Sequence, residues 1–256
     1  MIRTKSEAEI AVLRENALMV SKTLAEVGRH IEPGITTKEL DVIAERYIRS
    51  LGAVPGFLGY EGFPATLCLS VNDVVVHGFP SAYKLKEGDI ISVDCGTIYR
   101  GYYGDSAYTF PVGKVDARTR QLLDATKQAL EKGIEQAVAG NRTGDIGEAV
   151  QTYCENLGFS VVRELVGHGL GTDMHESPEV PNYGRRGHGV KLHEGMVICI
   201  EPMINAGKKE VYLDENGWAV HTADGAKSAH FEKTVVVRHG KPEVLTTFEF
   251  IEKEIC

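Results

Sequence analysis

The 256-residue sequence has no excess of basic residues, no long apolar run and no leader-like start. Lys and Arg total 28 against 36 Asp and Glu, and the net charge of −8 argues against a broad nucleic-acid-binding face. No apolar run approaches the ~20 residues that cross a bilayer. Residues 1–7 turn charged and polar at once, so no signal peptide is expected. We therefore expect a cytoplasmic protein with neither a membrane nor a nucleic-acid partner.

Cysteine is scarce, and several familiar signatures are absent. The five cysteines are odd in number and form no CxxC pair, which favours free thiols over disulfides or a thiolate zinc site. There is no HExxH, GxSxG or Walker A motif, which excludes a thermolysin-type zinc helix, a hydrolase nucleophile elbow and a P-loop. The glycines within 167–171 have the wrong spacing for a dinucleotide-binding loop.

The sequence does contain the patterns of alternating helices and strands. Capping boxes at Ser6 and Thr36 each open an apolar pattern of helical spacing, and glycines follow both patterns. We predict helices over residues 7–28, 37–51, 116–138 and 143–157. We predict strands over residues 66–71, 74–78, 89–95, 107–112, 160–164, 196–201, 211–213, 218–222 and 231–238.

This order of elements occurs twice. Gly34 and Gly52 flank the second predicted helix 18 residues apart, and Gly140 and Gly158 flank the fourth at the same separation. A Leu-x-Glu-Gly motif precedes a strand in each half, and an acid follows its glutamate by seven residues, as Asp94 and as Glu201. We therefore predict one α+β domain over residues 1–256. Its two pseudo-symmetric halves, about 1–112 and 113–250, would share an antiparallel sheet with the helices outside.

Two acids flank a glycine- and tyrosine-rich segment. Antiparallel pairing centred between Tyr99 and Arg100 would place Asp94 opposite Asp105, across a hairpin loop of residues 97–104. Directly opposed carboxylates are unfavourable unless a cation or a shared proton compensates them. A metal is the simplest compensation. From these two residues alone, a solvated pair beside a turn remains the alternative.

Three further polar residues enlarge this set. Glu201 ends one apolar strand and Glu232 precedes another, where unpaired acids are rare. His168 stands between glycines, which let the backbone approach a neighbour closely. One histidine with four carboxylates is an oxygen-rich set suited to borderline or hard divalent ions. Its charge of −4 predicts two such ions rather than one.

In order and context, these five residues resemble the metal ligands of the type I methionine aminopeptidases. Residues 167–178 and 72–78 are similar to that family's signatures, and the resemblance covers about residues 5–250. It implies the pita-bread fold and a hydrolase that removes the initiator methionine of nascent proteins and peptides when the second residue is small. Leu165 and Met174 depart from the common pattern, which leaves fine substrate preference open.

The resemblance also implies a role for each residue. Asp94 would bind one metal, Asp105 and Glu232 both, and His168 and Glu201 the other. Glu201 would also shuttle protons for a water activated by the two cations. His77 and His175 would contact the substrate and stabilise the oxyanion. The substrate-binding pocket would be lined by Tyr60, Phe63, Cys68 and Trp218. The ions could be Co, Mn, Fe or Zn.

The remaining expectations are less specific. Carbonyls near Asn72 and Val74, with Ser228, resemble a monovalent-cation site. The other histidines are expected to be surface or packing residues: 30, 188, 193, 221, 230 and 239. The expected partners are peptides with an N-terminal Met, nascent chains and the ribosome, and the expected state is a monomer.

Two alternatives remain open at this point. A proline-directed aminopeptidase of the same fold would carry a large additional N-terminal domain, whereas only 76 residues precede His77. A non-catalytic binding protein of this fold would have lost metal ligands, whereas all five are present. Metal analysis combined with a Met-peptide assay would distinguish these functions.

Overall fold

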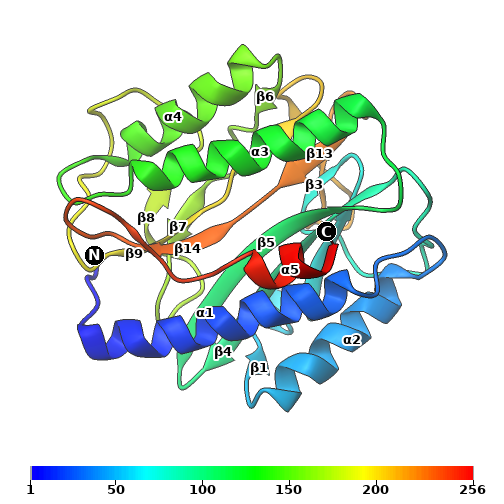
Figure 1. The fold of residues 1–256 in the computed structure, drawn as a ribbon, viewed down its shortest axis with the longest axis horizontal. Helices are drawn as coiled ribbons and strands as arrows, with labels where there is room; N and C mark the ends of the chain where they lie inside the picture. Colours follow the sequence, from blue (N-terminus) through cyan, green and yellow to red (C-terminus); the bar gives the residue numbers. More distant parts are fainter. Residues whose placement is uncertain (1, 256) are drawn as a thin grey trace.

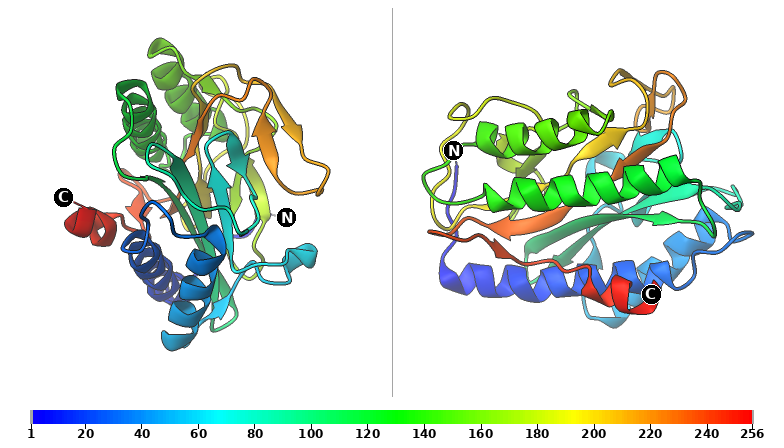
Figure 2. Two further views of the ribbon diagram at one scale, coloured as in Figure 1. Left: turned by 90° about the vertical axis from the view of Figure 1, so that its right-hand side faces the viewer. Right: turned by 45° about the horizontal axis from the view of Figure 1, so that its top comes forward.

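The protein is described by a computed structural model over residues 2–255. Four long helices form two pairs (Figure 1). The first pair is α1 (Glu7–Gly28) and α2 (Thr37–Ser50), and the second is α3 (Ala117–Glu135) and α4 (Thr143–Asn156). The members of each pair contact each other, and the pairs lie on the same side of the strands (Figure 2). A short helix, α5 (Glu249–Ile255), lies against α1.

The first two helices begin where the capping boxes predict. Ser6 and Thr36 each accept a hydrogen bond from the backbone three residues on, and Glu9 and Glu39 return the contact. This arrangement satisfies N–H groups that a helix start would otherwise leave unpaired. All four predicted long helices are confirmed to within three residues of their ends, the largest difference being at the end of α3.

Among the described residues, the strands form four antiparallel sheets. The first contains β1 (Val54–Pro55), β4 (Ile90–Tyr99), β2 (Leu67–Val71) and β5 (Tyr102–Pro111). The second contains β13 (Ser228–His230), β10 (Met203–Asn205) and β6 (Ser160–Val161). The third contains β11 (Val211–Leu213), β12 (Val220–Thr222) and β3 (Val74–Val76). The fourth contains β15 (Glu243–Val244), β14 (Lys233–Val236), β9 (Val197–Ile200), β7 (Gly167–Gly169) and β8 (Glu176–Val180).

The β4–β5 hairpin differs from the prediction. Tyr99 pairs with Tyr102, so the connection is only Arg100 and Gly101, both with positive φ, at 50° and 79°. Two such residues match the twist of the flanking strands, so the strands continue into the segment expected to be a loop. The predicted register is wrong by two residues: Asp94 faces Ala107, and Asp105 faces Gly96. The two acids are therefore diagonal neighbours rather than directly opposed.

The strand β5 meets the start of β14 along a line of hydrogen bonds. The Glu232 N–H donates to the Ala107 carbonyl at 2.9 Å, and the Ser106 hydroxyl donates to the Glu232 carbonyl at 2.6 Å. The Thr234 hydroxyl donates to the Asp105 carbonyl at 2.7 Å. These bonds fix Glu232 beside Asp105 although the two are far apart in the sequence.

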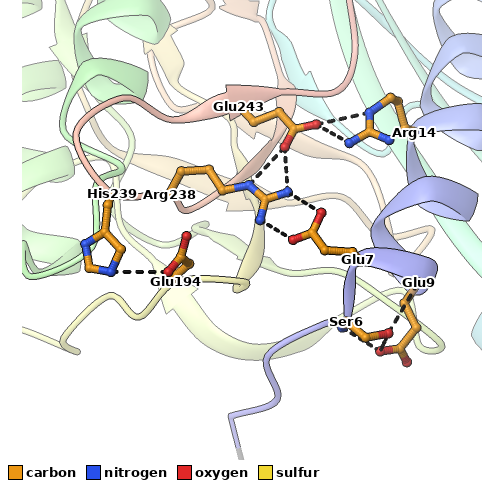
Figure 3. Close-up of polar contacts among 8 residues, drawn as sticks. All are labelled: Ser6, Glu7, Glu9, Arg14, Glu194, Arg238, His239 and Glu243. Carbon is orange, nitrogen blue, oxygen red and sulfur yellow. Dashed lines mark hydrogen bonds and ion pairs between the residues drawn. The ribbon is translucent and has the colours of Figure 1, made fainter.

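A network of charged residues holds α1 against the strand that follows β14 (Figure 3). The Arg238 guanidinium donates to Glu7 and to Glu243, each at 3.0 Å, and Arg14 donates to the same Glu243 at 3.0 Å. The bidentate geometry favours Arg over Lys at this position. The network therefore links α1 to the hairpin formed by β14 and β15.

Within residues 2–255, none of the helices is both long and apolar enough to cross a bilayer. The four cysteines of this range are buried free thiols, as predicted: Cys68, Cys95, Cys154 and Cys199. The fifth, Cys256, lies outside the described residues.

Candidate metal centre

A cavity of about 500 Å³ gathers the side chains that the sequence suggested as metal ligands, as catalytic histidines and as the lining of the substrate pocket. It is lined by the five expected metal ligands Asp94, Asp105, His168, Glu201 and Glu232, and by His77, His175, Tyr60, Phe63, Cys68 and Trp218. Both halves of the chain contribute to it.

The four acids reach the cavity from strands or strand ends. Asp94 and Asp105 project from β4 and β5, Glu201 directly follows β9, and Glu232 directly precedes β14. Asp105 and Glu232 are 3% and 2% exposed. Rigid strands therefore hold these carboxylates close together away from water.

His168 occupies the middle of β7, between two glycines that place it. A Cβ at Gly167 would lie 2.3 Å from the Cys199 carbonyl oxygen, and one at Gly169 would lie 2.5 Å from the Ser177 carbonyl oxygen. Only glycine permits this approach to β8 and β9. The sequence predicted that these glycines let the backbone approach a neighbour closely. That neighbour is the backbone of the adjacent strands β8 and β9.

The imidazole of His168 faces the acids through one nitrogen. Its Nδ1 lies 2.9 Å from the Gly169 carbonyl oxygen, an acceptor, so Nδ1 carries the proton. Its Nε2 lies 3.6 Å from Asp105 Oδ2 and 3.5 Å from Glu201 Oε1. Burial lowers the pKa of His168, which keeps the ring neutral. The free lone pair of Nε2 is therefore presented to the carboxylates, as in metal-binding histidines.

The acids lack sufficient hydrogen bonds of their own. Three buried oxygens have no hydrogen-bond partner among residues 2–255: Asp94 Oδ1, Asp105 Oδ1 and Glu232 Oε1. Ligand atoms of Asp105, His168, Cys199 and Glu232 all lie within 4.8 Å of one another. Buried polar atoms without partners are costly, and cations would satisfy them. The donor set therefore fits divalent metal ions.

The acids also raise one another's pKa values. Burial, with repulsion from Glu201, raises the pKa of Asp94 to about 7 although His230 opposes the shift. Burial raises the pKa of Glu201 to about 7 as well. The pKa values of Asp105 and Glu232 rise well above their usual range, through burial and then repulsion from neighbouring acids. Bound cations would reverse these shifts.

Two histidines lie beside the acids. His175 packs against His168 with ring centroids 4.5 Å apart, and its Nδ1 lies 3.0 Å from the Tyr60 hydroxyl. His77 has a positive φ of 59° and contacts Trp218 with ring centroids 6.2 Å apart. Burial lowers the pKa of His175, and it lowers that of His77 to about 4. Both rings are therefore neutral near pH 7.

An aromatic wall closes one side of the cavity. Phe63 contacts Trp218 and Phe79, with ring centroids 5.2 and 5.3 Å apart, and Cys68 is buried in the same cluster. Leu165 also lines the cavity. Met174, in contrast, is fully buried in a cluster with Phe57 and Tyr60 packed against it.

Two residues near the centre were missed by the sequence analysis. His230 was read only as a surface or packing residue, yet it is 2% exposed and lines the cavity. Cys199 was read only as a free thiol, yet its sulfur belongs to the ligand-atom cluster. Cys199 lies in β9 two residues before Glu201, a period-two signal available in the sequence. His230 ends β13, whereas Glu232 directly precedes β14, so no common strand pattern relates those two residues.

Two residues of the expected monovalent-cation site, Ser228 and Asn72, are in contact. The Ser228 N–H donates to the Asn72 carbonyl oxygen at 2.8 Å. This bond occupies one lone pair of the carbonyl, and a second remains available.

Comparison with known proteins relates this arrangement to peptidases. A family model described as "Metallopeptidase family M24" matches residues 11–239. Methionine aminopeptidase of Clostridium acetobutylicum is 48% identical over 250 residues, which cover 97% of this chain and all of that protein. Methionine aminopeptidase 1 of Bacillus subtilis is 48% identical over 246 residues, covering 96% of this chain and 99% of that protein.

The same relationship is seen in three dimensions. The crystal structure of methionine aminopeptidase from Rickettsia prowazekii superposes with a TM-score of 0.95 at 40% sequence identity. The match covers 96% of this chain and all of that one. The expected pita-bread class, with antiparallel strands and outer helices, is therefore confirmed.

Proposed function

The chain belongs to metallopeptidase family M24, and from this membership we propose how its cavity acts on peptides. The protein is a metal-dependent hydrolase that removes N-terminal methionine. Full-length identity to methionine aminopeptidases carries this conclusion, because it spans both halves that build the cavity. The natural substrates we propose are nascent proteins and peptides whose second residue is small.

We propose that the cavity holds two divalent ions, of Co, Mn, Fe or Zn. Asp94 would hold one ion, His168 and Glu201 the other, and Asp105 and Glu232 both. The unpartnered oxygens and the facing Nε2 of His168 support this assignment. When bound, such ions lower the pKa of a water and polarise the scissile carbonyl.

Glu201 is the proposed proton carrier. Its carboxylate lines the cavity, and one of its oxygens lies 3.5 Å from Nε2 of His168. A carboxylate positioned beside the reacting water can act as a general base and then as a general acid. Glu201 would take the proton of the attacking water and pass it to the leaving amine.

His175 and His77 are proposed to hold the substrate and its developing oxyanion. Nδ1 of His175 pairs with the Tyr60 hydroxyl, and we assign the hydroxyl as the donor. In this tautomer the other ring nitrogen carries the proton and can donate to the oxyanion. His77, beside Trp218, would hold the scissile amide. Both rings can donate as neutral imidazoles.

The aromatic wall, together with Tyr60, is the proposed binding site for the methionine side chain. Phe63, Cys68 and Trp218 of this wall line the cavity beside the acids, as does Tyr60. Aromatic rings make favourable contacts with a thioether, which suits this lining to methionine.

The remaining features are proposed on less direct support. The chain is proposed to form one catalytic domain over residues 1–256 with halves of about 1–112 and 113–250. It is proposed to act as a monomer in the cytoplasm and to meet nascent chains at the ribosome. The bond between Ser228 and the Asn72 carbonyl supports the proximity that a monovalent-cation site requires.

The test uses matched tripeptides with metal-loaded and chelator-treated protein. We expect release of methionine from Met-Ala-Ser, much less from Met-Leu-Ser, and no cleavage of Ala-Pro-Ser. Chelation should abolish the release of methionine. Addition of a single kind of divalent ion to the chelator-treated protein should restore it. Preferential cleavage of the proline peptide would contradict the proposed specificity. Retention of full activity after verified metal removal would contradict metal dependence.

A further inference from the structure

His230 is the one residue of β13 that combines burial, an open nitrogen and a place in the cavity. Only 2% of it is exposed, and it lines the cavity with Asp94 and Glu201. Within residues 2–255, its Nε2 has no hydrogen-bond partner. A buried ring nitrogen without a partner is costly, so its position calls for a function.

Each carboxylate oxygen of Glu201 faces one imidazole nitrogen at nearly the same distance. His168 Nε2 lies 3.5 Å from one carboxylate oxygen, and His230 Nε2 lies 3.6 Å from the other. Both separations exceed a normal hydrogen bond. Two ligands, each about 2.1 Å from one ion in tetrahedral geometry, lie roughly 3.4 Å apart. Both imidazoles therefore stand at the spacing of co-ligands to Glu201.

The backbone fixes His230 in this place. Its N–H donates to the Thr109 hydroxyl at 2.9 Å, and its carbonyl accepts from the same hydroxyl at 2.7 Å. Thr109 belongs to β5, and β13 also contacts β4, the strand of Asp94. His230 thus approaches the acids from the side of Asp94, whereas His168 approaches from β7.

We propose that His230 is a second imidazole ligand of the metal centre, on the ion held by Glu201. This inference rests on the proposed two-metal centre and adds a nitrogen donor on the side of Glu201 that His168 does not face. That ion then has two imidazoles among its ligands. Nitrogen ligation favours Co, Fe and Zn over Mg and Mn at that position.

The test detects the metal–nitrogen bond directly. Protein labelled with ¹⁵N-histidine is loaded with ¹¹³Cd²⁺, and ring nitrogens are observed through their carbon-bound protons. A coordinated nitrogen is split by coupling to ¹¹³Cd. We expect two split signals in the wild type and one in His230→Gln. His168→Gln should lose the other signal.

Calorimetry with Co²⁺ provides the second measurement. His230→Gln should bind one of the two equivalents at least ~10-fold more weakly, since even partners outside the ligand set contribute that much. His230→Asn serves as a second variant in case one replacement fails to fold. His239→Gln removes an exposed histidine paired with Glu194 and should change neither measurement (Figure 3).

The outcomes separate this inference from the function on which it rests. A single split signal that disappears only in His168→Gln would overturn the assignment of His230 and leave the metal centre intact. Weaker Co²⁺ binding in His230→Gln with an unsplit His230 signal would also overturn it, because His230 would then act only through Glu201. No split signal at either histidine would contradict the metal centre itself.

Discussion

The Tyr60 hydroxyl lies 3.0 Å from Nδ1 of His175, although 115 positions separate the two residues. The rings also make an edge contact with centroids 5.4 Å apart. Tyr60 begins the short 3₁₀ turn Tyr60–Gly62, and Tyr60 and Glu61 line the cavity. The pair thus fixes both the orientation of the histidine ring and the nitrogen that faces the cavity.

Replacement of Tyr60 by Phe should affect catalysis through this contact. Without the hydroxyl, His175 loses the partner that sets its tautomer, so kcat should fall by about 10-fold. The ring and its packing remain, so metal content should not change. Steady-state kinetics on a Met-Ala peptide with metal analysis checks this. An unchanged kcat would show that the hydroxyl does not orient His175.

Replacement of His175 by Ala should be more severe. Loss of a donor to the developing oxyanion typically lowers kcat ~10²–10³-fold. KM should change far less, because the interaction forms mainly in the transition state. Metal content should stay at the wild-type value. Loss of a full equivalent of metal would make His175 a ligand instead, and a near-normal kcat would leave it only a structural role.

Asp105→Asn and Glu201→Gln should both inactivate the enzyme, for different reasons. Asp105 is proposed to bind both ions. The uncharged side chain in Asp105→Asn should therefore reduce the number of metal ions bound per chain. Glu201→Gln should retain at least one ion but lose proton transfer. Metal analysis of both variants after identical loading provides the comparison. Equal and full occupancy in the two would contradict this division of roles.

Metal binding should depend on pH near neutrality. Asp94 and Glu201 have pKa values of about 7 without cations, and both must be ionised to bind a metal. Metal affinity should therefore fall as the pH drops through about 7. Binding at pH ~6.5 should release protons, measured by calorimetry in buffers of different ionisation enthalpy. Proton-neutral binding there would contradict the raised pKa values.

The stability of the metal-free protein should follow the same groups. A carboxylate with a raised pKa binds more protons folded than unfolded, so its contribution to stability is lost as the pH rises through about 7. His77 opposes this below pH 6.5, because its pKa is about 4 when folded. The free energy of unfolding should thus decrease from pH 6.5 to about 8. Denaturant titrations without metal measure it, and a rise over this range would contradict the assignment.

Gly167→Ala should disturb the metal centre through the backbone. The added Cβ would lie 2.3 Å from the Cys199 carbonyl oxygen, so β7 must move and His168 with it. Overpacking of this kind costs ~1–3 kcal/mol of stability. Co²⁺ affinity should also fall. Gly184→Ala is the control, because its nearest neighbour would lie at 3.2 Å and it is not part of the cavity lining. Equal effects of the two substitutions would contradict a specific role for Gly167.

Sequence patterns predicted the structural elements that depend on residues close together in the chain. The capping boxes at Ser6 and Thr36 fixed two helix starts because the cap and its glutamate lie within one turn. The strands β7 and β8 were not predicted, since one is rich in glycine and the other contains Pro178. Their pairing depends on neighbours that are distant in the sequence.

The candidate site shows the same division. The acids were found because a charged residue at the end of an apolar strand is conspicuous. The register of Asp94 and Asp105 was wrong because the loop composition suggested a long turn, whereas Arg100 and Gly101 alone reverse the chain. His230 was missed because only the three-dimensional structure shows which partners its nitrogen lacks.

The division of the cavity between the two halves has a consequence for biosynthesis. Asp94 and Asp105 precede residue 113, whereas His168, Glu201 and Glu232 follow it. Chains fold broadly from the N-terminus as they are made, so the first helices and the β4–β5 hairpin can form early. The centre cannot assemble until translation has passed Glu232. A partly synthesised copy therefore has the two aspartates but no catalytic centre, and premature termination anywhere before Glu232 yields an inactive product.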